Sequence, residues 1–242
     1  MMPSQFKLKN IVLWGRSGSE YQAMFNLTPQ DLEGTILDCG GGPSSFNAEM
    51  TQKHYKVVSC DPIYQFNAST IASRIQETYP IILQGLRDRA DRFLWQDIET
   101  PEQLGEVRLA AMQQFLADFP TGKQQNRYLV AQLPQLPFKD AQFSLALCSH
   151  LLFTYTEQLS FDCHRDALLE MLRVAPEVRV FPLVENFSGE TSAHLQPLIQ
   201  QLRERGYDTK IEAVNYEFQR GGNQMLRIGA RPTTASTAAL VG

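Results

Sequence analysis

A glycine-rich turn directly after an apolar run is the feature that most constrains how this chain folds. Thr35 to Cys39 predicts a buried strand, and Gly40 to Gly42 follow it at once. We expect a helix to begin at Pro43, a favoured first-turn residue, with the hydroxyls of Ser44 and Ser45 close by. Glycine lets the backbone approach a ligand closely, and a helix N-terminus favours an anionic group. The turn therefore predicts a ligand site.

A carboxylate stands where a nucleotide-type site needs one. Lys56 to Cys60 predicts the second strand, and Asp61 follows it, roughly 20 residues past the glycines. At that place its two oxygens could accept hydrogen bonds from both ribose hydroxyls. The alternative is a turn-starting aspartate before Pro62. An apolar or aromatic side chain at Ile63 or Tyr64 could then pack on an adenine face.

The rest of the chain alternates apolar runs with amphipathic stretches, which is typical of βα units around a mostly parallel sheet. The seven expected strands span 35–39, 56–60, 127–130, 143–149, 178–183, 209–218 and 225–230. The connection 219–223 is too short for a crossover helix, so the last two strands must pair antiparallel. The predicted fold class is α/β: a three-layer αβα sandwich whose seven-stranded sheet ends in an antiparallel hairpin strand.

The amphipathic stretches predict the helices and the domain limits. One helix should follow Asp61-Pro62 and end near Pro80, and others should span 160–174 and 195–206. We expect a single domain over 1–232, a disordered tail over 233–242, and a helical insertion over about 84–122 that could form a lid. The expected apolar face of that insertion is Leu104, Val107, Ala111, Phe115 and Phe119.

Composition excludes several classes of function. The formal net charge of −4 argues against a nucleic-acid partner, which usually requires a basic face. The first residues lack the apolar run of a signal peptide and no segment is apolar enough to span a membrane, so we expect a cytoplasmic protein. The 4 cysteines lack the spacing of a metal site and are best interpreted as reduced core thiols.

Three segments resemble the motifs of class I S-adenosylmethionine (SAM)-dependent methyltransferases, across about Trp14 to Arg231. ILDCGGGPSSF resembles the family's first motif, Asp-x-Gly-x-Gly-x-Gly, with Ser44 in place of the last glycine. VVSCDPIY resembles the second motif. LPQLPFKDAQFSLALCSHLLF resembles the segment of the third and fourth strands, with Ser144 in place of the usual aspartate.

The resemblance implies the Rossmann-like methyltransferase fold, SAM as cofactor, and a set of cofactor contacts. Asp38 and the backbone around Gly40 and Gly42 would contact the methionine part of SAM, and Asp61 the ribose. Gln132 stands where the family often has an acidic residue near the adenine amino group, and a glutamine carbonyl can still accept from that amine. The full set implied is Arg16, Asp38, Cys39, Gly40, Gly42, Ser44, Asp61, Pro62, Ile63, Tyr64, Gln132, Leu133 and Ser149.

Two single residues carry further hypotheses. Arg16 could meet the methionine carboxylate if the leading segment folds over the cofactor; the alternative is a surface arginine. His150, just beyond the fourth strand, could act as a general base, or it could pack against the cofactor or bond backbone. Other candidates for the acceptor side are Trp14, Tyr21, Tyr155, Glu185 and Asn186.

These features favour a methyltransferase acting on a small molecule, with a protein acceptor as a further option. A second hypothesis is a non-catalytic protein that binds SAM or S-adenosylhomocysteine. A third is a nicotinamide-dependent oxidoreductase. It is disfavoured by Ser45, which stands where the dinucleotide fingerprint has its last glycine, and by the C-terminal hairpin.

Overall fold

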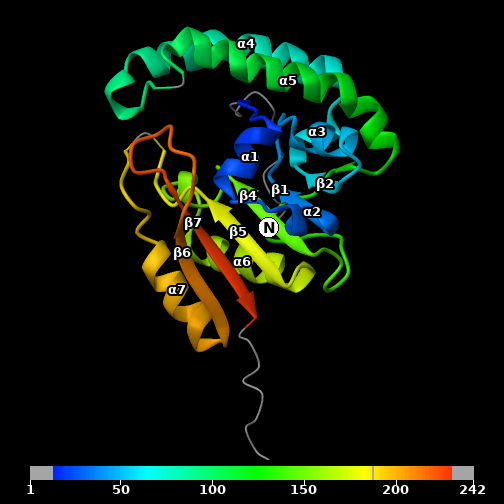
Figure 1. Cartoon of the computed structure of the whole chain (residues 1–242), viewed down its shortest axis with the longest axis vertical. Coiled ribbons are helices and arrows are strands. Elements are labelled where there is room, and N and C mark those ends of the chain that lie inside the picture. Colours follow the sequence, from blue (N-terminus) through cyan, green and yellow to red (C-terminus); the bar gives the residue numbers. More distant parts are fainter. Residues whose placement is uncertain (1–12, 97, 187, 231–242) are drawn as a thin grey trace, which may run out of the picture.

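A seven-stranded sheet forms the centre of the molecule (Figure 1). The structure, a computed structural model, describes residues 13–96, 98–186 and 188–230. The strand order is β3-β2-β1-β4-β5-β7-β6, with β1 to β5 parallel and β7 antiparallel to both of its neighbours. The strands are β1 (Thr35–Cys39), β2 (Lys56–Cys60), β3 (Tyr128–Leu129), β4 (Leu145–Ser149), β5 (Glu177–Phe181), β6 (Tyr207–Ala213) and β7 (Gln224–Ala230). The predicted fold class is confirmed.

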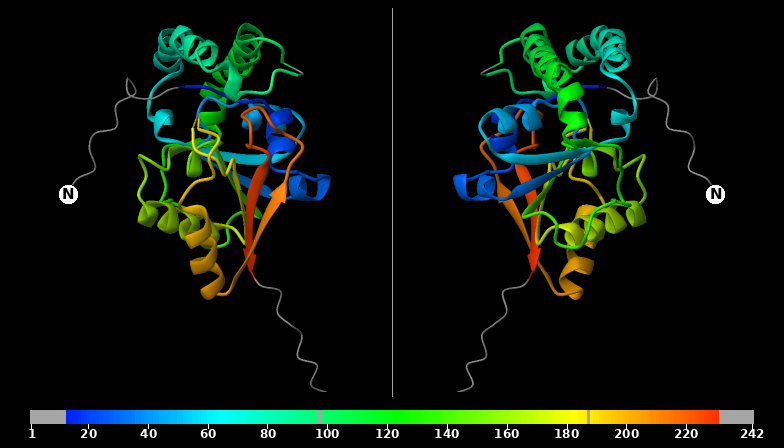
Figure 2. Two further views of the ribbon diagram at one scale, coloured as in Figure 1. Left: turned by 90° about the vertical axis from the view of Figure 1, so that its left-hand side faces the viewer. Right: turned by 90° about the vertical axis from the view of Figure 1, so that its right-hand side faces the viewer.

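Helices cover both faces of the sheet (Figure 2). The first face packs against α1 (Gly18–Met24), α2 (Pro29–Glu33) and α3 (Phe46–Gln52), and the second against α6 (Phe161–Val174) and α7 (Leu195–Glu204). Because strand side chains alternate between faces, Ile36 joins the first core while its neighbour Leu37 joins the second. These two apolar cores therefore hold the helical layers to one sheet.

Two long helices lie across the edge of the sheet to which the parallel strands point (Figure 1). These are α4 (Ala68–Arg87) and α5 (Pro101–Gln124), and the turn η3 (Ala90–Arg92) lies between them. Two further single turns lie at this edge, η2 (Pro62–Gln65) after β2 and η4 (Phe153–Tyr155) after β4. The helical pair thus covers the region where the glycine turn and Asp61 lie.

The prediction that the first of these helices ends near Pro80 is wrong. Helix α4 continues through Pro80 to Arg87, and Leu83 and Leu86 beyond the proline are buried. Leu86 packs in one apolar cluster with Leu104 of α5. Tertiary packing therefore outweighs the hydrogen bond that a proline removes from a helix. The expected insertion over 84–122 is in fact the end of α4, a connecting segment and most of α5.

The apolar face predicted for α5 is correct except at Val107. Val107 is 37% exposed, and the neighbouring Arg108, 1% exposed, takes the buried position instead. The buried positions of α5 are Leu104, Gly105, Arg108, Ala111, Met112, Phe115, Phe119 and Gly122. A charged side chain on an otherwise apolar stripe needs a partner, and that partner belongs to the site described below.

The strand expected over 209–218 ends five residues early. β6 stops at Ala213, and the following segment crosses to the helical insertion instead of continuing the hairpin. The ring of Phe218 stacks on Phe93 with centroids 4.9 Å apart, and the amide of Leu94 donates to the carbonyl of Phe218. This contact between segments far apart in sequence overrides the β pattern. The smaller boundary differences are those of β4, which begins at Leu145, and β5, which spans Glu177–Phe181.

Three other expectations concern single residue types or the chain ends. Cys39, Cys60 and Cys148 are buried and free, as predicted, whereas Cys163 on α6 is only half-buried. Among the described residues, every helix is too short or too polar to cross a lipid bilayer. The tail over 233–242 lies outside the described residues.

Candidate active site

The glycine turn has the backbone that its composition predicts. Gly40 and Gly42 have φ of 70° and 53°, in the left-handed region that favours glycine. The helix after the turn starts later than predicted: α3 begins at Phe46, not Pro43. The reason is Ser44, whose hydroxyl donates to the carbonyl of Arg16 (2.8 Å) and accepts from the amide of Phe46 (3.1 Å). The leading segment is thereby fixed to the turn.

Asp61 is fixed at the end of β2 by two backbone amides. Its Oδ2 accepts from the amide of Gly42 (3.0 Å) and its Oδ1 from that of Ile63 (2.8 Å). Burial raises the pKa of Asp61 to about 6, although both amide hydrogen bonds act to lower it. Each carboxylate oxygen keeps a further lone pair, so the predicted contacts to two ribose hydroxyls remain open to it.

Asp38 is more enclosed than the sequence indicates. Its carboxyl is 1% exposed and accepts from the hydroxyls of Tyr21 (3.1 Å) and Ser59 (3.0 Å), which joins α1 to β2. Burial raises the pKa of Asp38 to about 7. A Cβ at Gly41 would stand 2.4 Å from Asp38 Oδ2 and 2.8 Å from the hydroxyl of Tyr64, so only glycine fits there. Asp38 therefore positions the turn, and its role toward a ligand stays a prediction.

Tyr64, one of the two residues predicted to pack on an adenine face, is enclosed by protein in this structure, and its contact with adenine stays a prediction. Tyr64 is 1% exposed, its ring is enclosed by aromatic rings of α5, and its hydroxyl donates to the carbonyl of Gly42 (2.9 Å). Ile63 is also 1% exposed and lies in the same cluster. Long-range packing against α5, which begins only at Pro101, determines both positions.

The other residues implied for the adenosine half lie at the open edge beside β2 and β3. Pro62 and Leu133 are half-buried, and Gln132 is exposed. Cys39 is buried in the core and Ser144 accepts from the amide of Thr35 (3.1 Å), which confirms a structural role for that serine. Pro62, Gln132 and Leu133 are therefore free to meet a ligand from solvent.

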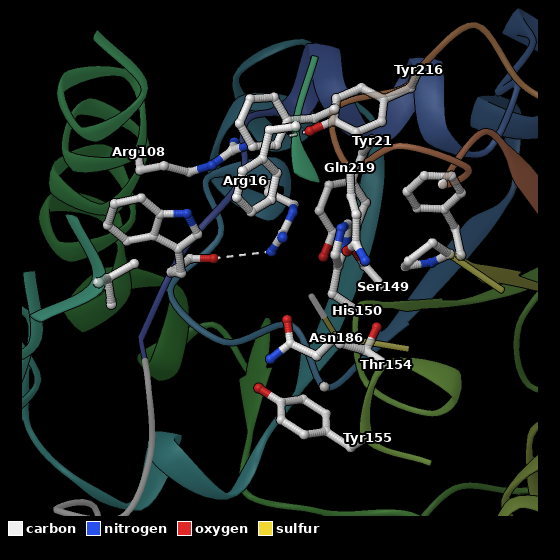
Figure 3. Close-up of a pocket in the computed structure, with 18 of the residues that line it drawn as sticks. Arg16, Tyr21, Arg108, Ser149, His150, Thr154, Tyr155, Asn186, Tyr216 and Gln219 are labelled. Carbon is white, nitrogen blue, oxygen red and sulfur yellow. Dashed lines mark hydrogen bonds between the residues drawn. The ribbon is translucent and has the colours of Figure 1, made fainter. Parts of the chain in front are cut away.

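A cavity of about 200 Å³ begins at the glycine turn and runs past the ends of β4 and β5 (Figure 3). The cavity is lined by Gly40 and Gly41 of the turn, by Ser149 at the end of β4 and the following His150, and by residues of the helical insertion. Of the predicted residues it also includes Trp14, Arg16, Tyr21, Tyr155 and Asn186. Asp61, Gln132, Leu133 and Glu185 are outside the cavity wall.

His150 lies at the end of β4 with an unusual backbone. Its φ is 50°, and its amide donates to the carbonyl of Phe181 (2.7 Å). Its Nδ1 is 2.8 Å from the hydroxyl of Ser149. Burial, followed by the charges of Arg16 and Arg108, lowers the pKa of His150 well below its usual value. His150 is therefore neutral at physiological pH, the state in which an imidazole can accept a proton.

Arg16 is a half-buried cation that lacks an ion-pair partner among the described residues. Its Nη1 donates to the carbonyl of Trp14 (3.1 Å), and its buried Nε has no hydrogen-bond acceptor within the described chain. Burial, then the charge of Arg108, lowers the pKa of Arg16. Figure 3 shows the guanidinium projecting into the open space toward which Asn186 and Tyr155 also point.

Arg108, by contrast, is part of a buried polar cluster that the sequence reading missed. Its Nη1 donates to both carboxylate oxygens of Glu20, and its Nη2 to the hydroxyl of Tyr216 (3.2 Å), which itself donates to Glu20 (3.0 Å). Burial would raise the pKa of Glu20, but Arg108 lowers it to about 2. The one available sequence signal was the charge at a stripe position of α5. The cluster joins α1, α5 and the segment before β7.

Comparison with known proteins identifies a close relative in sequence. The uncharacterized protein MJ0045 of Methanocaldococcus jannaschii is 33% identical over 222 residues, which cover 91% of this chain and 97% of the relative. No protein-family model matches the chain.

Solved structures with a similar arrangement are SAM-dependent methyltransferases at low identity. One from Methanosarcina mazei is 14% identical with a TM-score of 0.42, over 84% of this chain and 98% of that chain. Magnesium protoporphyrin IX methyltransferase from Synechocystis PCC 6803, crystallised with SAM, is 12% identical with a TM-score of 0.40, over 81% and 69%. The fold of this chain is established by its own strand order and not by these TM-scores.

That strand order, with a parallel β3-β2-β1-β4-β5 core followed by the antiparallel β7, is the one the methyltransferase resemblance implies. The likeness to the archaeal relative extends over nearly the whole of both chains. The chain therefore has the class I methyltransferase fold and belongs to the same protein family as MJ0045 of Methanocaldococcus jannaschii.

Proposed function

We propose that this chain binds SAM at the carboxyl ends of β1 and β2 and transfers its methyl group to a small acceptor in the adjoining cavity. The carrying observation is that the cavity opens directly from the glycine turn, at the point where the chain order reverses between β1 and β4. Ligands of open α/β sheets bind at this switch point.

The residues present fit an adenosine ligand. Gly41 lies where any side chain would overlap Asp38 and Tyr64, so the turn keeps its backbone bare toward the ligand. Asp61 is held in a fixed orientation by the amides of Gly42 and Ile63 and keeps free acceptor capacity. We place the ribose at Asp61, the adenine near Pro62, Gln132 and Leu133, and the methionine arm along Gly40 and Gly41.

In the reaction, the chain aligns the acceptor with the methyl group, excludes water from the cavity and accepts a proton from the acceptor. When bound, SAM supplies a methyl group on a sulfonium that is already strongly electrophilic, so alignment of the acceptor is the main requirement. Helices α4 and α5 and the segment with Tyr216 and Phe218 cover the cavity and limit solvent. His150, neutral and at the cavity wall, is the candidate base for an acceptor hydroxyl or amine.

The acceptor is proposed to be a small molecule handled in the cytoplasm, without a nucleic-acid partner. A cavity of about 200 Å³ is below the ~300–1,000 Å³ usual for drug-sized ligands. The formal charge of −4 and the covering helices disfavour a polyanion as acceptor.

Thermal unfolding tests the cofactor assignment. S-adenosylhomocysteine, SAM and NAD are titrated separately into the purified protein and into an Asp61→Asn variant, because a ligand at ~100 times its dissociation constant stabilises by ~2.7 kcal/mol. We expect both sulfur ligands to raise the transition temperature of the wild type, and the shift to shrink in the variant because one ribose acceptor is lost.

The matched control is Asp162→Asn, an exposed aspartate on α6 that should leave every shift unchanged. A shift with NAD alone would establish the oxidoreductase alternative in place of the methyltransferase. No shift with any of the three ligands would contradict SAM binding in either its catalytic or its non-catalytic form.

A further inference from the structure

We infer that the methyl acceptor is a small, flat molecule that carries a negative charge, most simply a carboxylate, and that Arg16 binds it. This inference rests on the proposed function and specifies the acceptor for the same site. It starts from the charges at the cavity wall. Arg108 is buried and paired with the carboxylate of Glu20, whereas Arg16 is half-buried, with a buried Nε, and has no carboxylate partner in the described chain.

Arg16 is arranged as a receptor for an anion. One guanidinium hydrogen bond is used, to the carbonyl of Trp14, and its Nε is buried without a partner in the described structure. Desolvating a cation is costly unless a counter-charge replaces the lost water. A planar guanidinium presents paired N–H groups that match the two oxygens of a carboxylate. The bound anion would therefore complete a site that the protein leaves open.

Charge balance around Arg16 favours an anionic acceptor. Arg16, Arg108 and Glu20 together leave one positive charge at this end of the cavity. The positive groups of SAM can be offset by Asp38 and Asp61 beside the glycine turn. Neither of these carboxyls is bonded to Arg16, so an anionic acceptor would neutralise the charge that remains there.

The remaining wall of the cavity indicates the body of the acceptor. Trp14, Phe93, Tyr155 and Phe218 present rings to the space, which suits a flat apolar group. Thr154 has a buried hydroxyl without a hydrogen-bond partner among the described residues, and it lies on the same wall. The size of the cavity limits the acceptor to about one ring with short substituents.

Calorimetry on the protein saturated with S-adenosylhomocysteine tests the inference with matched probes. Benzoate and 4-hydroxybenzoate are compared with benzamide and 4-hydroxybenzamide, which have the same shape without the charge. We expect each carboxylate to bind at least about tenfold more tightly than its amide, because the charged group gains hydrogen bonds to the guanidinium. The preference should disappear in Arg16→Met, which keeps the length of the side chain.

The control variant is Arg87→Met, which removes an exposed arginine and should keep the full preference for carboxylates. Equal binding of acids and amides to the wild type, or failure of all four to bind, would overturn the inference. The proposed function would stand in either case, provided that the wild type binds S-adenosylhomocysteine. If Arg16→Met weakens S-adenosylhomocysteine but keeps the carboxylate preference, Arg16 serves the cofactor and the inference is likewise overturned. Absence of S-adenosylhomocysteine binding in the wild type would instead contradict the proposed function.

Discussion

The two halves of the candidate site lie at one edge of one sheet, yet they are built in opposite ways. The β1–β2 half holds buried carboxyls, Asp38 and Asp61, whose partners are hydroxyls and backbone amides. The β4–β5 half holds two guanidiniums, the half-buried Arg16 and the buried Arg108, with Glu20 as their one carboxylate in the described chain. We call these the carboxylate half and the cationic half. The difference shows that one edge of a sheet can offer binding groups of opposite charge to two parts of its ligands.

The largest effect is expected from breaking the ion pair of the cationic half. Arg108→Met leaves Glu20 and Tyr216 without their buried partner, and such losses destabilise by about 4 kcal/mol. Urea unfolding monitored by circular dichroism measures it. The exposed pair of Arg87 and Glu102 serves as comparison, since Arg87→Met should cost less than about 1 kcal/mol. Equal effects of the two variants would show that the cluster does not hold the helical cover in place.

The two halves should respond to pH with opposite sign. The pKa of Asp38 is about 7 in the folded state, above its ordinary value, so its contribution to stability is present below pH ~4 and is lost as pH rises toward 7. The pKa of Glu20 is about 2, so its contribution is present above pH ~4.5 and is lost as pH falls toward 2.

Asp38→Asn isolates the first of these terms. Between pH 4 and 7 the free energy of unfolding of the wild type should fall relative to that of the variant, by on the order of 3 kcal/mol. Guanidinium unfolding at pH 4, 5.5 and 7 gives the comparison. Parallel curves for the two proteins over this range would mean that Asp38 is ionised at pH 4 in the folded protein.

Arg16→Met should stabilise the ligand-free protein. Removing a half-buried cation that has no carboxylate partner in the described chain relieves its partial desolvation and its repulsion from Arg108, with a gain of about 1 kcal/mol. Differential scanning calorimetry without ligand measures this. A lower transition temperature would show that Arg16 stabilises the fold and is not kept as a binding residue for an anion.

The smallest effect is expected at Tyr216, which shares the ion pair of the cationic half. Tyr216→Phe removes the hydroxyl that donates to Glu20 and accepts from Arg108, at a cost of about 0.5 to 1 kcal/mol. Urea unfolding again gives the value. Tyr207→Phe, a tyrosine of β6 for which the described structure gives no hydroxyl hydrogen bond, is the matched control and should leave stability unchanged.

The carboxylate half could be predicted from the sequence because its determinants are local. Asp61 follows β2 directly, and the glycines after β1 have the positive φ that their type favours. The antiparallel pairing of the last two strands could also be predicted, although their connection spans 214–223 in the structure and not 219–223. The enclosure of Tyr64 within this half could not be predicted, because it depends on packing against α5 far along the chain.

The cationic half could not be predicted because its parts come from remote segments. Glu20, Arg108 and Tyr216 are separated by 88 and 108 positions along the chain, and none forms a motif with its neighbours. Helix α4 likewise passes Pro80 because residues beyond the proline bury themselves against α5. Single-sequence patterns register local propensity, and here tertiary contacts outweigh it.

A calorimetric titration of 5′-methylthioadenosine into the wild type, Asp61→Asn and Arg16→Met tests the division of the site most directly. This ligand has the adenosine and the sulfur of SAM but lacks its amino-acid carboxylate. It should therefore contact only the half of the site that contains Asp38 and Asp61. The account predicts binding that weakens at least about tenfold in Asp61→Asn, which loses a charge-assisted hydrogen bond, and is unchanged in Arg16→Met. Binding that is lost in Arg16→Met and kept in Asp61→Asn would contradict it.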